Sequence, residues 1–185
     1  MTSIRVFRES RRILRRLMLG SALESNYIGE DVSKAAHMIQ AGLTARSERH
    51  PDEVVLACLL HDIGHLLAED DTNGYGVSDH ARLGAAFLRG LALPERTCRA
   101  VELHADAKRY IVGQDCTYPL THASRQTLAF QGGPMTLSER LDFEKDPAYA
   151  DALLVRGVDD RAKTEDMPHS VVATLFDGFF VCNGQ

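Results

Sequence analysis

Residues 53–69, EVVLACLLHDIGHLLAE, decide the fold of this chain. Every position from 54 to 67 is apolar or Gly except His61, Asp62 and His65. A helix of this composition is buried on almost all sides. A buried carboxylate or imidazole is costly unless it is paired or bound to a metal. His61 and Asp62 diverge by about 100° around a helix axis, so a shared ion would sit off the helix edge, among several helices.

A lone His-Asp pair has an equally good structural explanation. His61 can be a hydrogen-bonded core residue beside a capping or salt-bridged Asp62, with no metal present. The pair alone does not choose between these explanations, so the rest of the chain has to decide.

Length and composition describe an ordinary globular chain. Its 185 residues suit one domain, with 44% apolar and 25% charged residues. A formal net charge of −5 argues against a nucleic-acid partner held by overall positive charge. The four Cys residues form no Cys-x-x-Cys pair, which fits a reduced, cytoplasmic protein. No apolar run reaches the roughly 20 residues of a membrane span, and no signal segment is evident. We therefore expect one cytoplasmic domain over residues 1–185, with no membrane partner.

Helical signals dominate and strand signals are scarce, so the predicted class is all-α. Residues 1–20 have a basic amphipathic pattern, which is expected to form a peripheral helix with a solvated Arg face. A helix capped by Ser78 is expected to carry His80, and residues 113–134, rich in polar residues and Gly, are expected to be irregular. Residues 171–182 are apolar enough for a core or a dimer contact, and periodicity does not choose between these.

His and Asp residues recur at or near the predicted helices. They provide imidazoles and carboxylates without a thiolate, a set that suits iron, manganese or zinc. Six candidate ligands are too many for one tetrahedral ion, but two ions that share the Asp62 carboxylate could use all six. The predicted first site holds His37, His61, Asp62 and Asp159, and the second holds Asp62, His80 and His104. Three protein ligands leave positions open at the second ion for substrate and for water or dioxygen.

The order His, His-Asp, His, His, Asp resembles the HD-domain superfamily, a helical metal-binding fold whose members are mostly phosphohydrolases. Further stretches resemble a more specific family, the HD-domain diiron oxygenases that cleave 1-hydroxyphosphonates. They are YIGE (27–30), HDIGH (61–65), GYGV (74–77) with His80, HADAKRY (104–110), ASRQTL (123–128), FQGGPM (130–135), and Arg156 with Asp159. This resemblance covers about residues 24–165 and implies an HD-domain helical bundle around a dinuclear metal site.

The resemblance also implies cofactors and site residues. The six candidate ligands fall on the family's ligand positions for a mixed-valent Fe(II)/Fe(III) pair, with O2 as co-substrate. Tyr27 and Glu30 match a pair that occupies the site before substrate arrives. The residues that match substrate contacts are His65, Lys108, Ser124, Gln131 and Arg156. Cations and donors suit a phosphonate dianion in a pocket of low dielectric. Taken singly, each of these residues also has a plain packing, turn or surface explanation.

The implied substrate is a small 1-hydroxyphosphonate whose C2 carries either an amine or a trimethylammonium group. The products would be phosphate with glycine or with glycine betaine. A quaternary ammonium prefers aromatic faces and diffuse negative charge. The candidates for contacting it are Tyr27, Tyr75, Tyr118 and Asp106, and Asp106 follows His104 by two residues. The sequence does not choose between the two substrates, and it does not predict an oligomeric state.

Two other classes of function stay open. An HD phosphohydrolase acting on a nucleotide or phosphate ester would share all six ligands and use a metal-bound hydroxide. Tyr27 and Glu30 argue against it, because hydrolysis needs no residue to guard an open iron. A helical binding module with a structural metal is the non-enzymatic alternative, and Lys108 and Arg156 argue against it.

Overall fold

The computed structural model describes residues 2–20, 32–69, 72, 74–162 and 166–180, with side chains from residue 8 onward in the first range. Every element within these ranges is a helix, which confirms the predicted all-α class. The α-helices are α1 (Thr2–Leu19), α3 (Lys34–Ser47), α4 (Asp52–Leu60), α5 (His80–Gly90), α6 (Glu95–Gln114), α7 (His122–Phe130), α8 (Leu137–Phe143), α9 (Tyr149–Arg161) and α10 (His169–Phe179), and η1 (Ile63–Leu66) is a 3-10 helix. Among these helices, none has both the length and the apolar composition needed to cross a bilayer.

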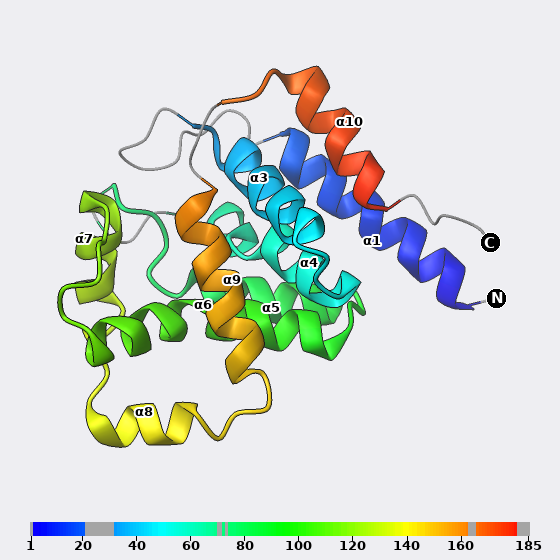
Figure 1. Cartoon of the computed structure of the whole chain (residues 1–185). Coiled ribbons are helices and arrows are strands. Elements are labelled where there is room, and N and C mark those ends of the chain that lie inside the picture. The colour runs from blue at the N-terminus through cyan, green and yellow to red at the C-terminus, as the bar shows by residue number, and fades with distance from the viewer. Residues whose placement is uncertain (1, 21–31, 70–71, 73, 163–165, 181–185) are drawn as a thin grey trace.

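Helix α6 packs against α4, α5 and α9, and α3 packs against α4 and α9. Helices α1 and α10 lie side by side at one edge of the bundle, and α8 lies away from them (Figure 1). Leu14 and Met18 of α1 belong to the main apolar core, as do Val172 and Phe176 of α10. The apolar C-terminal helix therefore contributes to the core. On the outer side, Asp177 pairs with arginines of α1, at 3.0 Å from Arg11 and from Arg15. This attaches part of the basic face to the bundle.

The central stretch is not one continuous helix. Helix α4 ends at Leu60, His61 and Asp62 form a turn, and η1 continues the chain. The break brings η1 against the start of α5, backbone to backbone, because Gly64 and Gly84 meet there without side chains. His61 and Asp62 therefore lie in the turn between α4 and η1, next to α5.

The prediction that residues 113–134 are irregular is wrong. Helix α6 extends to Gln114, and α7 occupies nine residues of this segment. The Thr121 hydroxyl caps α7 by accepting the Ser124 N–H at 3.2 Å, and Ala123 and Leu128 are buried. With only two buried apolar residues among polar neighbours, this segment shows too little helical periodicity in its apolar positions for a helix to be predicted from sequence.

The prediction for the cap of α5 is also wrong. Asp79, not Ser78, directly precedes the helix, and its side chain makes no capping bond. The start of the helix packs against η1, where Gly64 approaches the His80 carbonyl.

Gly64 generates the first prediction. A Cβ there would collide with the His80 carbonyl oxygen and would lie 2.9 Å from the Gly84 nitrogen. Because both are backbone atoms, the strain cannot be relieved by a rotamer change. We expect Gly64→Ala to lower the free energy of unfolding of the metal-loaded protein by about 1–3 kcal/mol, measured by denaturant titration.

Gly90→Ala is the matched control. A Cβ at Gly90 meets nothing within 4 Å. We expect unchanged or slightly higher stability, because Ala has the better helix propensity. Equal stability of the two variants would contradict the close approach of η1 and α5.

Candidate metal centre

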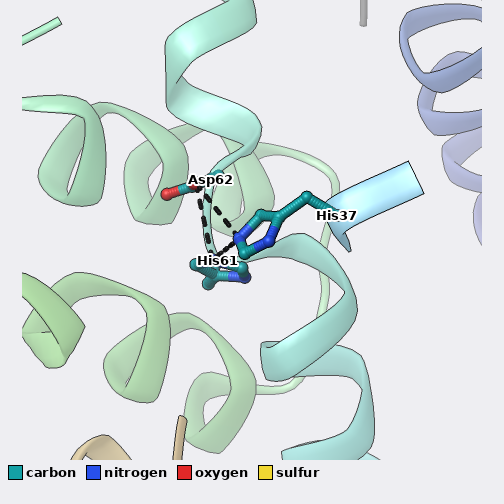
Figure 2. Close-up of side chains that lie close together, drawn as sticks. All are labelled: His37, His61 and Asp62. Atoms are coloured by element: carbon teal, nitrogen blue, oxygen red, sulfur yellow. Dashed lines mark hydrogen bonds and ion pairs between the residues drawn. The ribbon is translucent and has the colours of Figure 1, made fainter. Parts of the chain in front are cut away.

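Six side chains converge in the middle of the bundle from five places in the chain. His37 comes from α3, His80 from the start of α5, His104 from α6 and Asp159 from α9, while His61 and Asp62 form the turn after α4. All six are at most 5% exposed. Figure 2 shows His37, His61 and Asp62 pointing toward one another. The structure thus brings together all six residues that the sequence suggested as ligands.

The Asp62 carboxylate lies between two pairs of imidazoles. Its Oδ2 is 3.7 Å from His37 Nε2 and 3.5 Å from His61 Nε2. Its Oδ1 is 3.5 Å from His80 Nε2 and 3.6 Å from His104 Nε2. Within each pair the two Nε2 atoms are 3.1 Å apart. This geometry suits two ions that share one carboxylate, with one oxygen facing each ion.

Asp159 adds a fourth donor on one side only. Its Oδ1 is 3.2 Å from His37 Nε2 and 3.6 Å from His61 Nε2. The side formed by His37, His61, Asp62 and Asp159 is called the first site below. The side formed by Asp62, His80 and His104 is called the second site, and it has three protein donors.

Backbone hydrogen bonds fix which nitrogen of each candidate ligand His faces the centre. The Nδ1 atoms of His61, His80 and His104 each lie 2.7–2.9 Å from the carbonyl oxygen three residues earlier. His37 Nδ1 lies 3.1 Å from the Ala162 carbonyl oxygen. A carbonyl only accepts, so each Nδ1 carries the proton, and in the neutral ring Nε2 offers its lone pair. Two facing lone pairs cannot bond to each other, but both can bind a cation between them.

Unsatisfied oxygens point to a cation as well. Asp62 Oδ2 and Asp159 Oδ1 are buried and have no hydrogen-bond partner in the described part of the chain. Both face the first site. A buried carboxylate oxygen without a partner is costly, and a metal ion satisfies it directly. The donor set of nitrogen and oxygen without sulfur fits iron, manganese or zinc.

The charges around His61 agree with this assignment. Burial opposes a charge on His61, but the Asp62 and Asp159 carboxylates outweigh burial and raise its pKa to about 9. Burial likewise opposes charge on Asp62 and Asp159. The charge of His61 nevertheless holds the pKa of Asp62 well below its usual range, and Arg156 does the same for Asp159. The two carboxylates attract a positive charge to His61 Nε2, and a metal ion competes there with a proton.

His65 differs from the four ligand histidines. Its Nδ1 accepts the Val77 backbone N–H at 3.0 Å, so the neutral ring carries its proton on Nε2. The ring stacks on His80 with centroids 3.9 Å apart. Burial, with a smaller contribution from the Lys34 ammonium, lowers the pKa of His65 to about 4 against the opposing charge of Asp62. His65 therefore presents a neutral N–H donor to the pocket.

A pocket opens onto the second site. The described residues that line it include Asp62, Asp159, His80 and His104, but neither His37 nor His61. Its other described lining residues are Lys34, His65, Tyr75, Ala105, Lys108, Ala123, Ser124, Thr127, Gln131 and Arg156. A small molecule in this pocket would meet the second site before the first.

The predicted substrate residues fall into three groups. His65, Lys108, Ser124, Gln131 and Arg156 all line this pocket. Asp106 is absent from its described lining and instead accepts a hydrogen bond from Arg109 at 3.1 Å, on a separate hollow of the surface. Tyr27 and Glu30 lie outside the described residues.

Lys34 and Thr127 are pocket residues that sequence reasoning missed. Lys34 precedes the ligand His37 by three residues, so both lie on one face of α3. Thr127 follows Ser124 by three residues on α7, and its hydroxyl accepts a hydrogen bond from the Lys108 ammonium at 2.9 Å. In both cases the three-residue spacing to a predicted site residue on the same helix could have indicated that the side chain lies near the pocket.

Arg156 joins the pocket to the first site. Its Nη1 donates to Asp159 Oδ2 at 2.7 Å, so it holds the carboxylate whose other oxygen faces the metal position. Its Nε and Nη2 donate hydrogen bonds to the Asp160 carboxylate. The Tyr118 hydroxyl also donates to Asp160, at 2.8 Å. This network fixes the orientation of a guanidinium that is only 4% exposed.

The shared carboxylate generates the second prediction. We expect Asp62→Ala to bind neither ion, because both sites lose a donor and the buried imidazoles lose their counter-charge. Asp159→Ala should keep the second-site ion. The measurement is metal per chain after reconstitution and desalting, with circular dichroism to verify helix content.

Asp106→Ala is the control for this experiment, and it should bind metal as the wild type does. An Asp62→Ala protein that kept two ions per chain would contradict the bridging assignment.

Arg156 generates the third prediction. The Arg156 guanidinium donates to the carboxylates of Asp159 and Asp160 at the same time, and a lysine ammonium lacks the planar array of N–H groups that this requires. We therefore expect Arg156→Lys to weaken the binding of inorganic phosphate to the metal-loaded protein by about tenfold or more, as for the loss of a charged hydrogen bond. Isothermal titration calorimetry measures the change.

Arg161→Lys provides a matched control on the same helix. Arg161 is exposed and pairs with Glu48 outside the pocket, so phosphate binding should not change. Equal phosphate affinities in the two variants would contradict a role of Arg156 in anion binding.

Comparison with known proteins places these features in a family. The HD-domain family model matches residues 19–153. The chain is 36% identical over 152 residues to [1-hydroxy-2-(trimethylamino)ethyl]phosphonate dioxygenase (glycine-betaine-forming) of Leisingera caerulea, covering 78% of this chain and 76% of that protein. It is 34% identical over 151 residues to hydroxymethylphosphonate dioxygenase of Gimesia maris, covering 77% and 73%. An uncharacterized protein of Acanthamoeba polyphaga mimivirus is 34% identical over 145 residues, covering 75% and 66%. The chain belongs to the HD-domain family, and its similarity to phosphonate dioxygenases supports an oxygenase.

Proposed function

We propose that this protein uses O2 to cleave the carbon-phosphorus bond of a 1-hydroxyphosphonate. One observation carries the proposal: of the two sites that share Asp62, only the second has its histidines in the pocket lining, beside the buried Lys108 and Arg156. A phosphonate dianion that reaches the open ion would meet these cations. The names of two relatives, both phosphonate dioxygenases, support the same chemistry.

The proposed reaction balances without a further reductant. A 1-hydroxyphosphonate and O2 give a carboxylate, hydrogen phosphate and one proton. The C1–H and carbon-phosphorus bonds break, C1 and phosphorus are oxidised, and both oxygen atoms are reduced. The two sites would hold iron, and a mixed-valent Fe(II)/Fe(III) pair supplies the activation of O2 when bound.

The pocket residues would position the substrate. Lys108 is held by Thr127, and Arg156 is held by Asp159 and Asp160, so both cations are oriented before an anion arrives. Ser124 and Gln131 add polar groups, and Gln131 Oε1 is buried without a hydrogen-bond partner in the described residues. That oxygen would accept a hydrogen bond from the substrate.

The N–H of His65 would also bind the substrate. His65 lines the pocket, its ring stacks on His80, and its Nε2 lies 3.9 Å from Asp62 Oδ1 of the second site. Tyr27 as a provisional ligand of the open iron, with Glu30 as its partner, remains a prediction from the sequence.

The fourth prediction tests this function. Iron-loaded protein is offered 2-amino-1-hydroxyethylphosphonate or its trimethylammonium analogue, the two substrates that the sequence suggests. We expect O2 uptake and phosphate release in equal amounts, with glycine or glycine betaine as the second product. Without O2, phosphate release should stop.

Lysine variants provide the control. Lys108→Gln should abolish most of the activity, because the pocket loses a buried cation. Lys145→Gln should not, because that lysine is exposed and pairs with Asp142. Phosphate released equally well without O2, or released only from phosphate esters, would favour the metal-dependent phosphohydrolase instead.

A further inference from the structure

Lys34 occupies a position that helix stability does not explain. It is the first residue of α3, directly after the N-cap Ser33, and the first turn has no acidic residue. The positive end of the helix dipole disfavours a cation there. Lys34 nevertheless lines the pocket together with Asp62, His80 and His104. Its position brings a third cation to the open metal site.

The three pocket cations differ in their protein partners. The Lys108 ammonium donates to Thr127, and Arg156 grips Asp159 and Asp160. Lys34 forms no ion pair with any carboxylate in the described part of the chain. The nearby Asp166 carboxylate accepts the Ser33 N–H at 3.0 Å. Lys34 is thus the pocket cation best placed to take a ligand as its partner.

His65 extends the same part of the pocket. Both residues line this pocket, and His65 Nε2 lies 3.9 Å from Asp62 Oδ1, beside the second site. Because Val77 occupies Nδ1, the neutral His65 ring presents its Nε2–H. The two side chains therefore offer only hydrogen-bond donors. A carboxylate can accept from both, whereas an ammonium group would be repelled by Lys34 and could accept from neither.

The rest of the described pocket also lacks a receptor for a cation. Its carboxylates are Asp62 and Asp159, and both belong to the metal sites. Tyr75 is the only Phe, Tyr or Trp in the described lining, whereas quaternary ammonium groups are typically held by a cage of several aromatic rings.

We propose that Lys34 and His65 form a second anion subsite beside the open metal, and that it selects 1-hydroxyphosphonates with a carboxylate on C2 over those with an ammonium group. This inference rests on the proposed function. The simplest such substrate is 2-carboxy-1-hydroxyethylphosphonate. With O2 it would give malonate, hydrogen phosphate and one proton, by breaking the same C1–H and carbon-phosphorus bonds.

The test compares substrates that differ only in the group on C2. Iron-loaded wild type, Lys34→Gln and the surface control Lys145→Gln are each offered the carboxylate and the ammonium compound, and kcat/KM is measured. We expect the wild type and Lys145→Gln to prefer the carboxylate compound. Lys34→Gln should lower the ratio of carboxylate to ammonium kcat/KM by about tenfold or more, the effect of losing one charged contact.

Two further measurements separate this subsite from a structural role. Lys34→Gln should keep the wild-type metal content, and its Tm should be equal or higher because an unfavourable charge leaves the start of the helix. Preference of the wild type for the ammonium compound, or a ratio that Lys34→Gln leaves unchanged, would overturn the inference.

A binding experiment distinguishes failure of the subsite from failure of the oxygenase function. Calorimetry compares 3-phosphonopropionate with 2-aminoethylphosphonate, which lack the C1 hydroxyl and carry a carboxylate or an ammonium group. If neither hydroxyphosphonate is turned over, the oxygenase function fails. The subsite then still requires tighter binding of 3-phosphonopropionate and loss of that difference in Lys34→Gln. Equal binding of both compounds by the wild type would overturn it.

Discussion

The Asp62 carboxylate, shared between two pairs of imidazoles, is the constraint on which the rest of the structure depends. Each oxygen faces one pair, so the helices that carry His37, His80 and His104 must all approach the turn after α4. A buried carboxylate is tolerated only with compensating positive charge. Metal binding would therefore be linked to the packing of the bundle, because bound ions would offset the negative charge that the helices enclose.

Local hydrogen bonds orient three of the four candidate ligand histidines. His61, His80 and His104 each bond through Nδ1 to a carbonyl three residues earlier, so a single turn of the chain sets the ring and its tautomer. His37 differs, because its carbonyl partner is Ala162 at the end of α9. The first site thus needs α3 and α9 docked together, and Asp159 on α9 reinforces that requirement.

The two candidate metal sites differ in their number of protein donors and in which of those donors line the pocket. The first site has four donors, and its two histidines are absent from the described pocket lining, whereas all three donors of the second site line the pocket with Lys34, Lys108 and Arg156. Arg156 connects the first site with the pocket, because it donates a hydrogen bond to Asp159 and also lines the pocket. An anion bound at the pocket therefore acts on the same residue that positions a ligand of the first site.

Sequence alone determined the helical class and the candidate ligand set, because buried polar residues in an apolar stretch need partners and few side chains can supply them. It did not locate α7, whose apolar period is short, or the break after Leu60, which depends on the contact of Gly64 with α5. Only the tertiary structure separated Asp106 from the pocket and added Lys34 to it, although both lie within three residues of a ligand His. Sequence spacing restricts which residues share a helix face, but the neighbouring helices decide what that face meets.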